Sequence, residues 1–208
     1  MQTRLEKKQE SRQRILTAAA KRLRQEGLGG AGVASVMDDA GLTHGAFYSH
    51  FQNKGELARA ALEEALLHNR KRWTGRWKRD SWASRLTELA KRYLTSRHRD
   101  NLDNSCALTA LCSEAARSDD AFRATYEQEL AKTLSAIADA DFDNLDPKQA
   151  DDVLAFMSLI VGSMALSRAV DSDALSERIL DAGRAAATRL ASVDALPPVT
   201  QQENSPHE

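Results

Sequence analysis

The sequence has few cysteines and no long apolar run, and these two absences exclude several classes of protein. Its 208 residues contain two cysteines, Cys106 and Cys112, which are too few for a disulfide framework or a zinc site built on cysteine. No segment reaches the run of about 18 apolar residues that a membrane-spanning helix needs, and no apolar stretch follows the charged amino terminus as in a signal peptide. We therefore expect free thiols, no metal site, no membrane association and a cytoplasmic location.

Runs of alternating β-branched residues are also missing, and helical periodicity takes their place. Ile15, Ala19 and Leu23 recur at helical spacing within residues 8–25, and a cluster of glycines ends that segment. Similar patterns predict two short helices at 33–40 and 43–50, a longer helix from residue 55, and further helices near 81–98, 103–117, 119–139, 147–170 and 173–192. We predict an all-α fold.

Charge is divided unevenly between the two halves of the chain. Residues 1–99 carry 21 Lys and Arg against 10 Asp and Glu, whereas residues 100–208 carry 8 against 20. The net charge of −1 thus conceals a basic half of +11 and an acidic half of −12. The basic half favours contact with a polyanion, although an ordinary solvated surface has the same composition.

The most informative segment is 32–57, GVASVMDDAGLTHGAFYSHFQNKGEL, which has the features of a helix-turn-helix. Gly41 permits a left-handed turn, and Leu42 fills the angle between two short helices. The second helix of such a motif lies in the major groove, where its amino-terminal residues meet base edges. The residues that open this helix either offer hydrogen-bonding groups or are small enough for close approach to bases: Thr43, His44, Gly45 and Ala46.

At these residues the chain resembles the TetR/AcrR family of transcriptional repressors. The resemblance rests on three stretches, Ala40-Gly41-Leu42-Thr43, Phe47-Tyr48-Ser49-His50-Phe51 and Asn53-Lys54. It implies phosphate contacts from Tyr48, His50 and Lys54, and base contacts from Thr43, His44 and Gly45. Many members begin the first short helix with a capping threonine or serine, whereas this chain has Gly32 and Ala34, so Ser35 is the best remaining donor on that helix.

The resemblance also implies the organisation of the whole chain: an amino-terminal three-helix DNA-binding domain and a helical ligand-binding and dimerisation domain. We expect the helix-turn-helix domain at 8–54, a connecting helix and hinge at 55–80, the ligand-binding and dimerisation domain at 81–195, and a flexible tail at 196–208. In this family the last two helices form a four-helix bundle with a second subunit. We therefore expect a homodimeric repressor, without a cofactor, that leaves a palindromic double-stranded DNA operator when a small-molecule inducer binds.

Three aromatic residues are candidates for contact with an inducer, two near the expected hinge and one within the predicted helix 147–170: Trp73, Trp77 and Phe156. They favour an apolar or aromatic ligand, although aromatic residues at helical spacing also serve as core.

Cys106 is a candidate sensor of a different kind. The segment Asn104-Ser105-Cys106 resembles a TetR subgroup with a glycine-cysteine pair at the start of the sixth helix, some of whose members sense electrophiles or oxidants; here serine replaces the glycine. A helix dipole and a cation such as Arg168 would favour the thiolate, but an inert thiol fits the sequence as well. We expect the side chain of Cys112 to be buried in the core.

Two other functions are compatible with parts of the sequence. Cys106, His98 and Asp103 lie close together, as in an enzyme, but no phosphate loop or metal-binding histidine pair accompanies them, and His98 and Asp103 fit a helix end and a cap. We therefore predict that the protein is not an enzyme. A DNA-binding factor that needs no ligand, and activation in place of repression, also fit the sequence.

Overall fold

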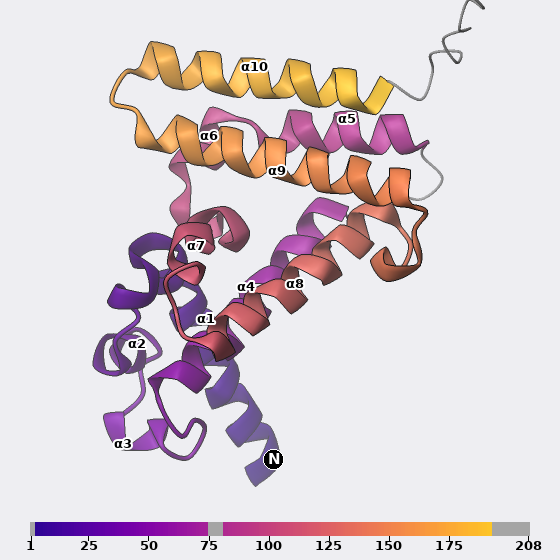
Figure 1. Ribbon diagram of the computed structural model, residues 1–208. Coiled ribbons are helices and arrows are strands. Elements are labelled where there is room, and N and C mark those ends of the chain that lie inside the picture. The colour runs from indigo at the N-terminus through magenta and orange to yellow at the C-terminus, as the bar shows by residue number, and fades with distance from the viewer. Residues whose placement is uncertain (1–2, 75–80, 193–208) are drawn as a thin grey trace, which may run out of the picture.

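The structure is a computed structural model that describes residues 3–74 and 81–192, and these residues form helices, turns and loops without a strand (Figure 1). The predicted all-α fold is confirmed. Trp77 and the expected tail at 196–208 lie outside the described residues. In chain order the elements are α1 (Arg4–Gly30), α2 (Val33–Asp39), α3 (His44–Phe47), α4 (Lys54–Thr74), α5 (Trp82–Tyr93), α6 (Ser96–Asp100), the 3₁₀ helix η1 (Leu102–Asn104), α7 (Ala107–Ala115), α8 (Asp120–Ala138), the 3₁₀ helix η2 (Phe142–Asn144), α9 (Pro147–Ala169) and α10 (Asp173–Ser192).

The helices form two groups that α4 connects (Figure 1). At one end α1 packs against α2 and α4, and α3 packs on α2. At the other end α10 packs on both α9 and α5, and the three helices lie in layers (Figure 1). Helix α4 packs on α1 near one group and on α8 near the other, so it touches both ends of the molecule.

Helix starts follow the capping signals of the sequence. Thr3 and Glu6 form a reciprocal capping box at the start of α1. The side chain of Asp119 accepts a hydrogen bond from Phe122 N at the start of α8. Asp146 accepts one from Gln149 N and is followed by a first-turn proline at the start of α9. These local signals explain why the expected starts at 119 and 147 lie within one residue of the observed ones.

Helix α1 is longer than the expected 8–25 and is broken near its end. Gly27 has φ 70° and ψ −166°, a conformation that only glycine adopts readily. The break frees the N–H of Leu28, which donates to Glu114 Oε2 at 2.7 Å. The amino-terminal group of helices is thereby joined to α7.

Two expected helices are interrupted. The segment 81–98 divides into α5 and α6 because Leu94 leaves the helical conformation, with ψ 71°, and Thr95 caps a new helix by accepting from His98 N. The segment 103–117 begins as η1, which Asn101 caps. His98 lies in the last turn of α6, near the predicted helix end, whereas the prediction of a cap at Asp103 was wrong because Asn101 caps η1.

Helix α9 is strongly apolar, although part of its surface is not buried. Among the described helices it is the one whose length and composition would allow it to cross a membrane. Core helices of soluble proteins share this length and composition. Part of the apolar surface is open in the single chain, since Leu154 is 40% and Leu166 is 60% exposed.

Candidate functional site

The helix-turn-helix is built around a tight turn between α2 and α3. Gly41 has φ 63°, in the left-handed region, and the N–H of Leu42 donates to Met37 O at 3.0 Å. The inner faces of the motif are apolar and buried: Val36, Met37, Phe47 and Phe51. The backbone therefore presents the opposite face of α3 to solvent.

Arg14 of α1 holds this turn from outside the motif. Its Nη2 donates to the carbonyl of Ala40 and, at 3.3 Å, to that of Gly41. Glycine is favoured at position 41 by its positive φ, and a Cβ added there would lie 2.8 Å from the same nitrogen, so the guanidinium of Arg14 would have to shift. Sequence reasoning missed this contact because it joins residues 26 and 27 positions apart.

The predicted DNA-contacting residues lie together at this end of the molecule, with different exposures. Thr43, His44, Gly45, Tyr48 and Lys54 are exposed, whereas Ser35, Ala46 and His50 are half-buried. Helix α3 itself is shorter than the expected 43–50. Thr43 is its N-cap residue, and residues 48–50 form turns.

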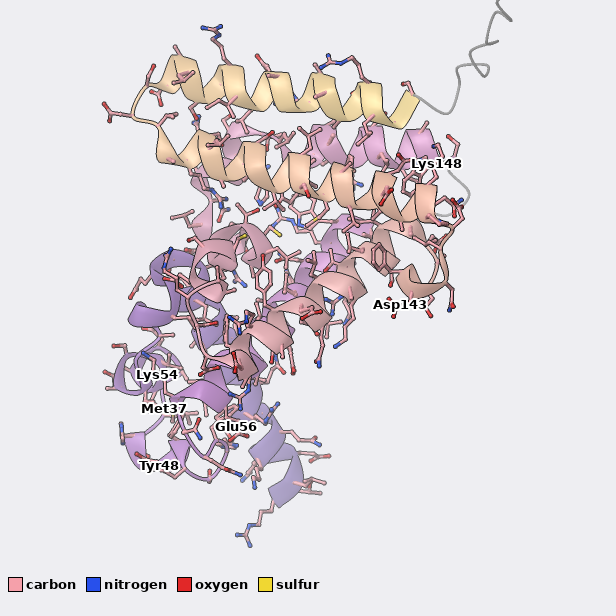
Figure 2. All side chains as sticks on the ribbon, in the orientation of Figure 1. Met37, Tyr48, Lys54, Glu56, Asp143 and Lys148 are labelled. Atoms are coloured by element: carbon pink, nitrogen blue, oxygen red, sulfur yellow. The ribbon has the colours of Figure 1, made fainter. Side chains whose placement is uncertain are left out.

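Tyr48 combines a fixed ring with a free hydroxyl. Its side chain is 67% exposed, and its ring packs edge-on against Phe47, with centroids 5.2 Å apart, and against His44 at 5.9 Å. Figure 2 shows Tyr48 and Lys54 at the end of the molecule that α2 and α3 form. A phenolic hydroxyl held outward in this way is suited to donate a hydrogen bond to a phosphate oxygen.

His50 links the motif to the amino-terminal turns of α1. Its Nε2 lies 2.9 Å from Ser11 Oγ, and burial, together with the positive charges of Lys8 and Arg12, lowers the pKa of the imidazole. The guanidinium of Arg12 lies 5.2 Å from the ring centroid of Phe51. The basic start of α1 thus lies beside the turn that follows α3. The charge pattern of the sequence showed that this segment is basic but did not predict where it lies.

The second candidate site is a small apolar cavity between α4, α5, α8 and α9. Its volume is about 20 Å³, enough for roughly one water molecule. Of the predicted ligand residues, Trp73 and Cys106 line it, together with Tyr93 and Met157. Phe156 is buried but does not line the cavity, and Arg168 lines a different, polar cleft.

The rings of Trp73, Tyr93 and His98 form a buried cluster beside this cavity. The ring centroids are 5.4 Å apart for Trp73 and Tyr93, 5.0 Å for Trp73 and His98, and 4.5 Å for Tyr93 and His98. The hydroxyl of Tyr93 lies 2.6 Å from Thr109 Oγ1, and burial followed by the proximity of Cys106 raises its pKa. The Nε1 of Trp73 is buried without a hydrogen-bond partner among the described residues.

Cys106 is the N-cap residue of α7, and other helices supply the cap. Its own N–H donates to His98 Nε2 at 3.1 Å, and Asn69 Oδ1 of α4 accepts from Ala107 N at 3.1 Å. Since Nε2 accepts, Nδ1 of His98 carries the proton and donates to Tyr93 O at 2.7 Å. Burial is the main reason that the pKa of His98 falls to about 4. Cys106 is 3% exposed, whereas Cys112 is exposed, so the expectation that Cys112 is buried was wrong.

Comparisons with known proteins agree with this geometry. Residues 15–61 match the family described as bacterial regulatory proteins, tetR family. Over 58 residues the chain is 40% identical to the HTH-type transcriptional regulator TtgR of Pseudomonas putida, a match that covers 28% of each protein. The chain therefore matches little more than a quarter of the length of this curated relative.

Solved structures are similar over most of the chain. A TetR transcriptional regulator from Chloroflexus aurantiacus is 18% identical with a TM-score of 0.71, and the match covers 90% of this chain and 96% of that one. The reduced form of NemR from E. coli is 16% identical with a TM-score of 0.70, with 86% and 95% covered. At these identities the likeness concerns the fold alone. The amino-terminal match therefore shows a DNA-binding segment of the tetR type at residues 15–61, and the solved structures show that the fold is shared over most of the chain.

Proposed function

We propose that the protein is a homodimeric, sequence-specific transcriptional repressor of the cytoplasm, released from a palindromic operator by a small molecule. The observation that carries the proposal is the outward face of the helix-turn-helix. Thr43 and Tyr48 are exposed there, and their hydroxyls have no hydrogen-bond partner among the described residues. Polar groups held outward by a packed scaffold are the arrangement that reads DNA.

The roles of individual residues follow from their positions on the motif. Thr43, His44, Gly45 and Ala46 open α3, so we assign them to base edges in the major groove. Tyr48 and Lys54 flank α3 and are assigned to phosphates. His50 and Ser35 are half-buried, and they are assigned the secondary role of completing the phosphate surface.

The unburied apolar surface of α9 and α10 supports a dimer. Leu154 and Leu166 of α9 and Leu175 of α10 are 40%, 60% and 45% exposed. Small residues that are also exposed lie between them along the two helices: Ala155, Ala165, Ala169, Ala174 and Ala182. Two such helices from each of two chains would cover one another as a four-helix bundle.

The cavity beside Cys106 supports a sensor role for residues 81–195. A volume of about 20 Å³ is too small for an organic inducer, so an inducer must select a conformation in which the surrounding helices have moved apart. Such a ligand lowers operator affinity only by binding that conformation more tightly than the DNA-bound one. The lining favours an apolar or aromatic molecule, and the thiol of Cys106 favours an electrophilic one.

The test is a selection of bound genomic DNA fragments with the purified full chain at stated salt, followed by titrations with variants. We expect enrichment of a palindrome. Lys54→Gln should weaken binding to all sequences and, because each chain of the proposed dimer loses one phosphate contact, reduce the slope of log affinity against log salt by about 1.8 per dimer. Lys91→Gln, an exposed lysine of α5, is the control and should leave that slope unchanged.

His44→Ala should instead change the preferred base at one position of each half-site. An unchanged preference would remove His44 from the assigned base contacts. No enrichment above non-specific binding would overturn the proposal as a whole. A palindrome bound by a protein that no apolar or electrophilic compound releases would remove the inducer from the proposal.

A further inference from the structure

A second hollow, more open and polar than the cavity beside Cys106, lies between the DNA-binding helices and the sensor helices. It is a cleft of about 690 Å³ lined by residues of α1, α6, α7, α9 and α10, a volume in the range of small-molecule sites. Four arginines line it, from four parts of the chain, against three carboxylates: Arg24, Arg99, Arg117 and Arg168, with Asp100, Glu114 and Asp173. The cleft is therefore positively charged.

One of the carboxylates is already paired with a cation, since Asp100 Oδ1 lies 2.7 Å from Arg99 Nε. Glu114 accepts from the main-chain N–H of Leu28 and keeps its charge. Arg99 also contacts Glu177 at 3.1 Å, so its own charge is neutralised from two sides.

The other three arginines have no carboxylate partner among the described residues. Arg168 donates to the main-chain carbonyls of His98 and Arg99 at 2.9 and 3.1 Å. Arg24 donates to the carbonyl of Asp103 at 2.7 Å, and Arg117 is exposed. Carbonyl contacts orient a guanidinium but leave its charge in place.

Partial burial makes these unpaired charges costly. Arg24 and Arg168 are half-buried, and burial is the main cause that lowers the pKa of each guanidinium. An anion in the cleft would restore the lost solvation and would meet planar, forked donors that suit carboxylate and phosphate oxygens.

We propose that this cleft binds a small multivalent anion, with two or more carboxylate or phosphate groups, through Arg24, Arg117 and Arg168. More than one anionic group is needed because the three arginines come from α1, from the end of α7 and from α9. A bound anion joins α1, which leads into the helix-turn-helix, to the sensor helices. The site is distinct from the cavity beside Cys106, since no residue lines both.

The test is isothermal titration calorimetry of the full chain with citrate and with pyrophosphate, each against sodium chloride at equal ionic strength. We expect binding of one anion per chain. Binding of citrate alone would show that the cleft recognises carboxylates, and binding of pyrophosphate alone would show that it recognises phosphates. Binding of both would show that it recognises the negative charge that the two anions share. A heat no greater than that of chloride for both probes overturns the proposal.

Variants locate the site. Arg117→Gln should weaken binding about fivefold, because an exposed ion pair contributes modestly, and the change leaves no described contact broken. Arg97→Gln removes an exposed arginine of α6 that does not line the cleft, and it should bind as the wild type does. Equal losses in both variants would show general attraction and overturn the site. The titration contains no DNA, so its outcome is independent of operator binding.

Discussion

Replacement of Gly27 by alanine tests the junction between the two groups of helices. Gly27 has φ 70° and ψ −166°, and a non-glycine residue held in that region costs about 1–3 kcal/mol. A Cβ at this position would lie 2.1 Å from Glu114 Oε1, so the carboxylate must move. Its hydrogen bond to Leu28 N would then be lost, at a further cost of about 1–2 kcal/mol for a half-buried charged acceptor.

Together these effects predict that Gly27→Ala lowers the free energy of unfolding by about 2–5 kcal/mol. The measurement is urea unfolding followed by circular dichroism, at one fixed protein concentration because a dimer makes stability depend on concentration. Gly29→Ala is the matched control. A Cβ there meets nothing within 4 Å and φ is not positive, so its stability should equal or slightly exceed that of the wild type.

A double-mutant cycle separates the two costs. In a Glu114→Ala background the clash and the hydrogen bond are both absent, so Gly27→Ala should then cost only the conformational strain, about 1–3 kcal/mol. Equal stabilities of the Gly27→Ala and Gly29→Ala variants would refute the reasoning, because neither the strain nor the contact with α7 would then exist.

Two further predictions concern buried polar groups. The pKa of His98 is about 4, below its ordinary 6.5, so its contribution to stability is complete above pH 6.5 and is lost as pH falls toward 4. Urea unfolding should show a loss of about 3 kcal/mol over that range that His98→Gln lacks, and parallel pH profiles would contradict this. Glu129, 2% exposed, pairs with Arg70 and with Lys132, each at 2.6 Å, so Glu129→Ala should cost about 3 kcal/mol by leaving the half-buried guanidinium of Arg70 unpaired. The exposed Glu127→Ala should change stability by less than about 0.5 kcal/mol, and a similar loss in both variants would show that the pair is not needed.

Helix starts were predictable where their signals are local. Asp119 and Asp146 lie directly before the helices that they cap, and each bonds an N–H three residues on. The break after Tyr93 has a local signal in Thr95, which caps α6, but contacts with more distant residues also hold it. The ring of His98 donates a hydrogen bond to the carbonyl of Tyr93, and Arg184 of α10 donates one to the carbonyl of Leu94. Contacts between residues 90 positions apart cannot be read from periodicity.

The candidate sites also differ in how far they could be predicted from local sequence. The outward residues of α3 could be named because the apolar residues of the motif fix which face is buried. The sensor residues could not be grouped, since their positions depend on how α4, α7 and α9 are rotated against one another. Trp73 and Cys106 line one cavity and Arg168 lines a different cleft. Exposure of Cys112 likewise depends on which face of α7 its neighbours cover.

Helix α7 is the element through which either hollow can act on the DNA-binding group. Its first residues are held by His98 and Asn69 beside the apolar cavity, and Glu114 in its last turn holds the broken end of α1. Helix α7 spans nine residues, so we expect that a ligand that displaces the bonds at Cys106 and shifts the helix would also strain the bond between Glu114 and Leu28. An anion beside Glu114 acts on the same bond from the other end. The two ligands would therefore influence one another's affinity, as linkage requires of sites that bias one element.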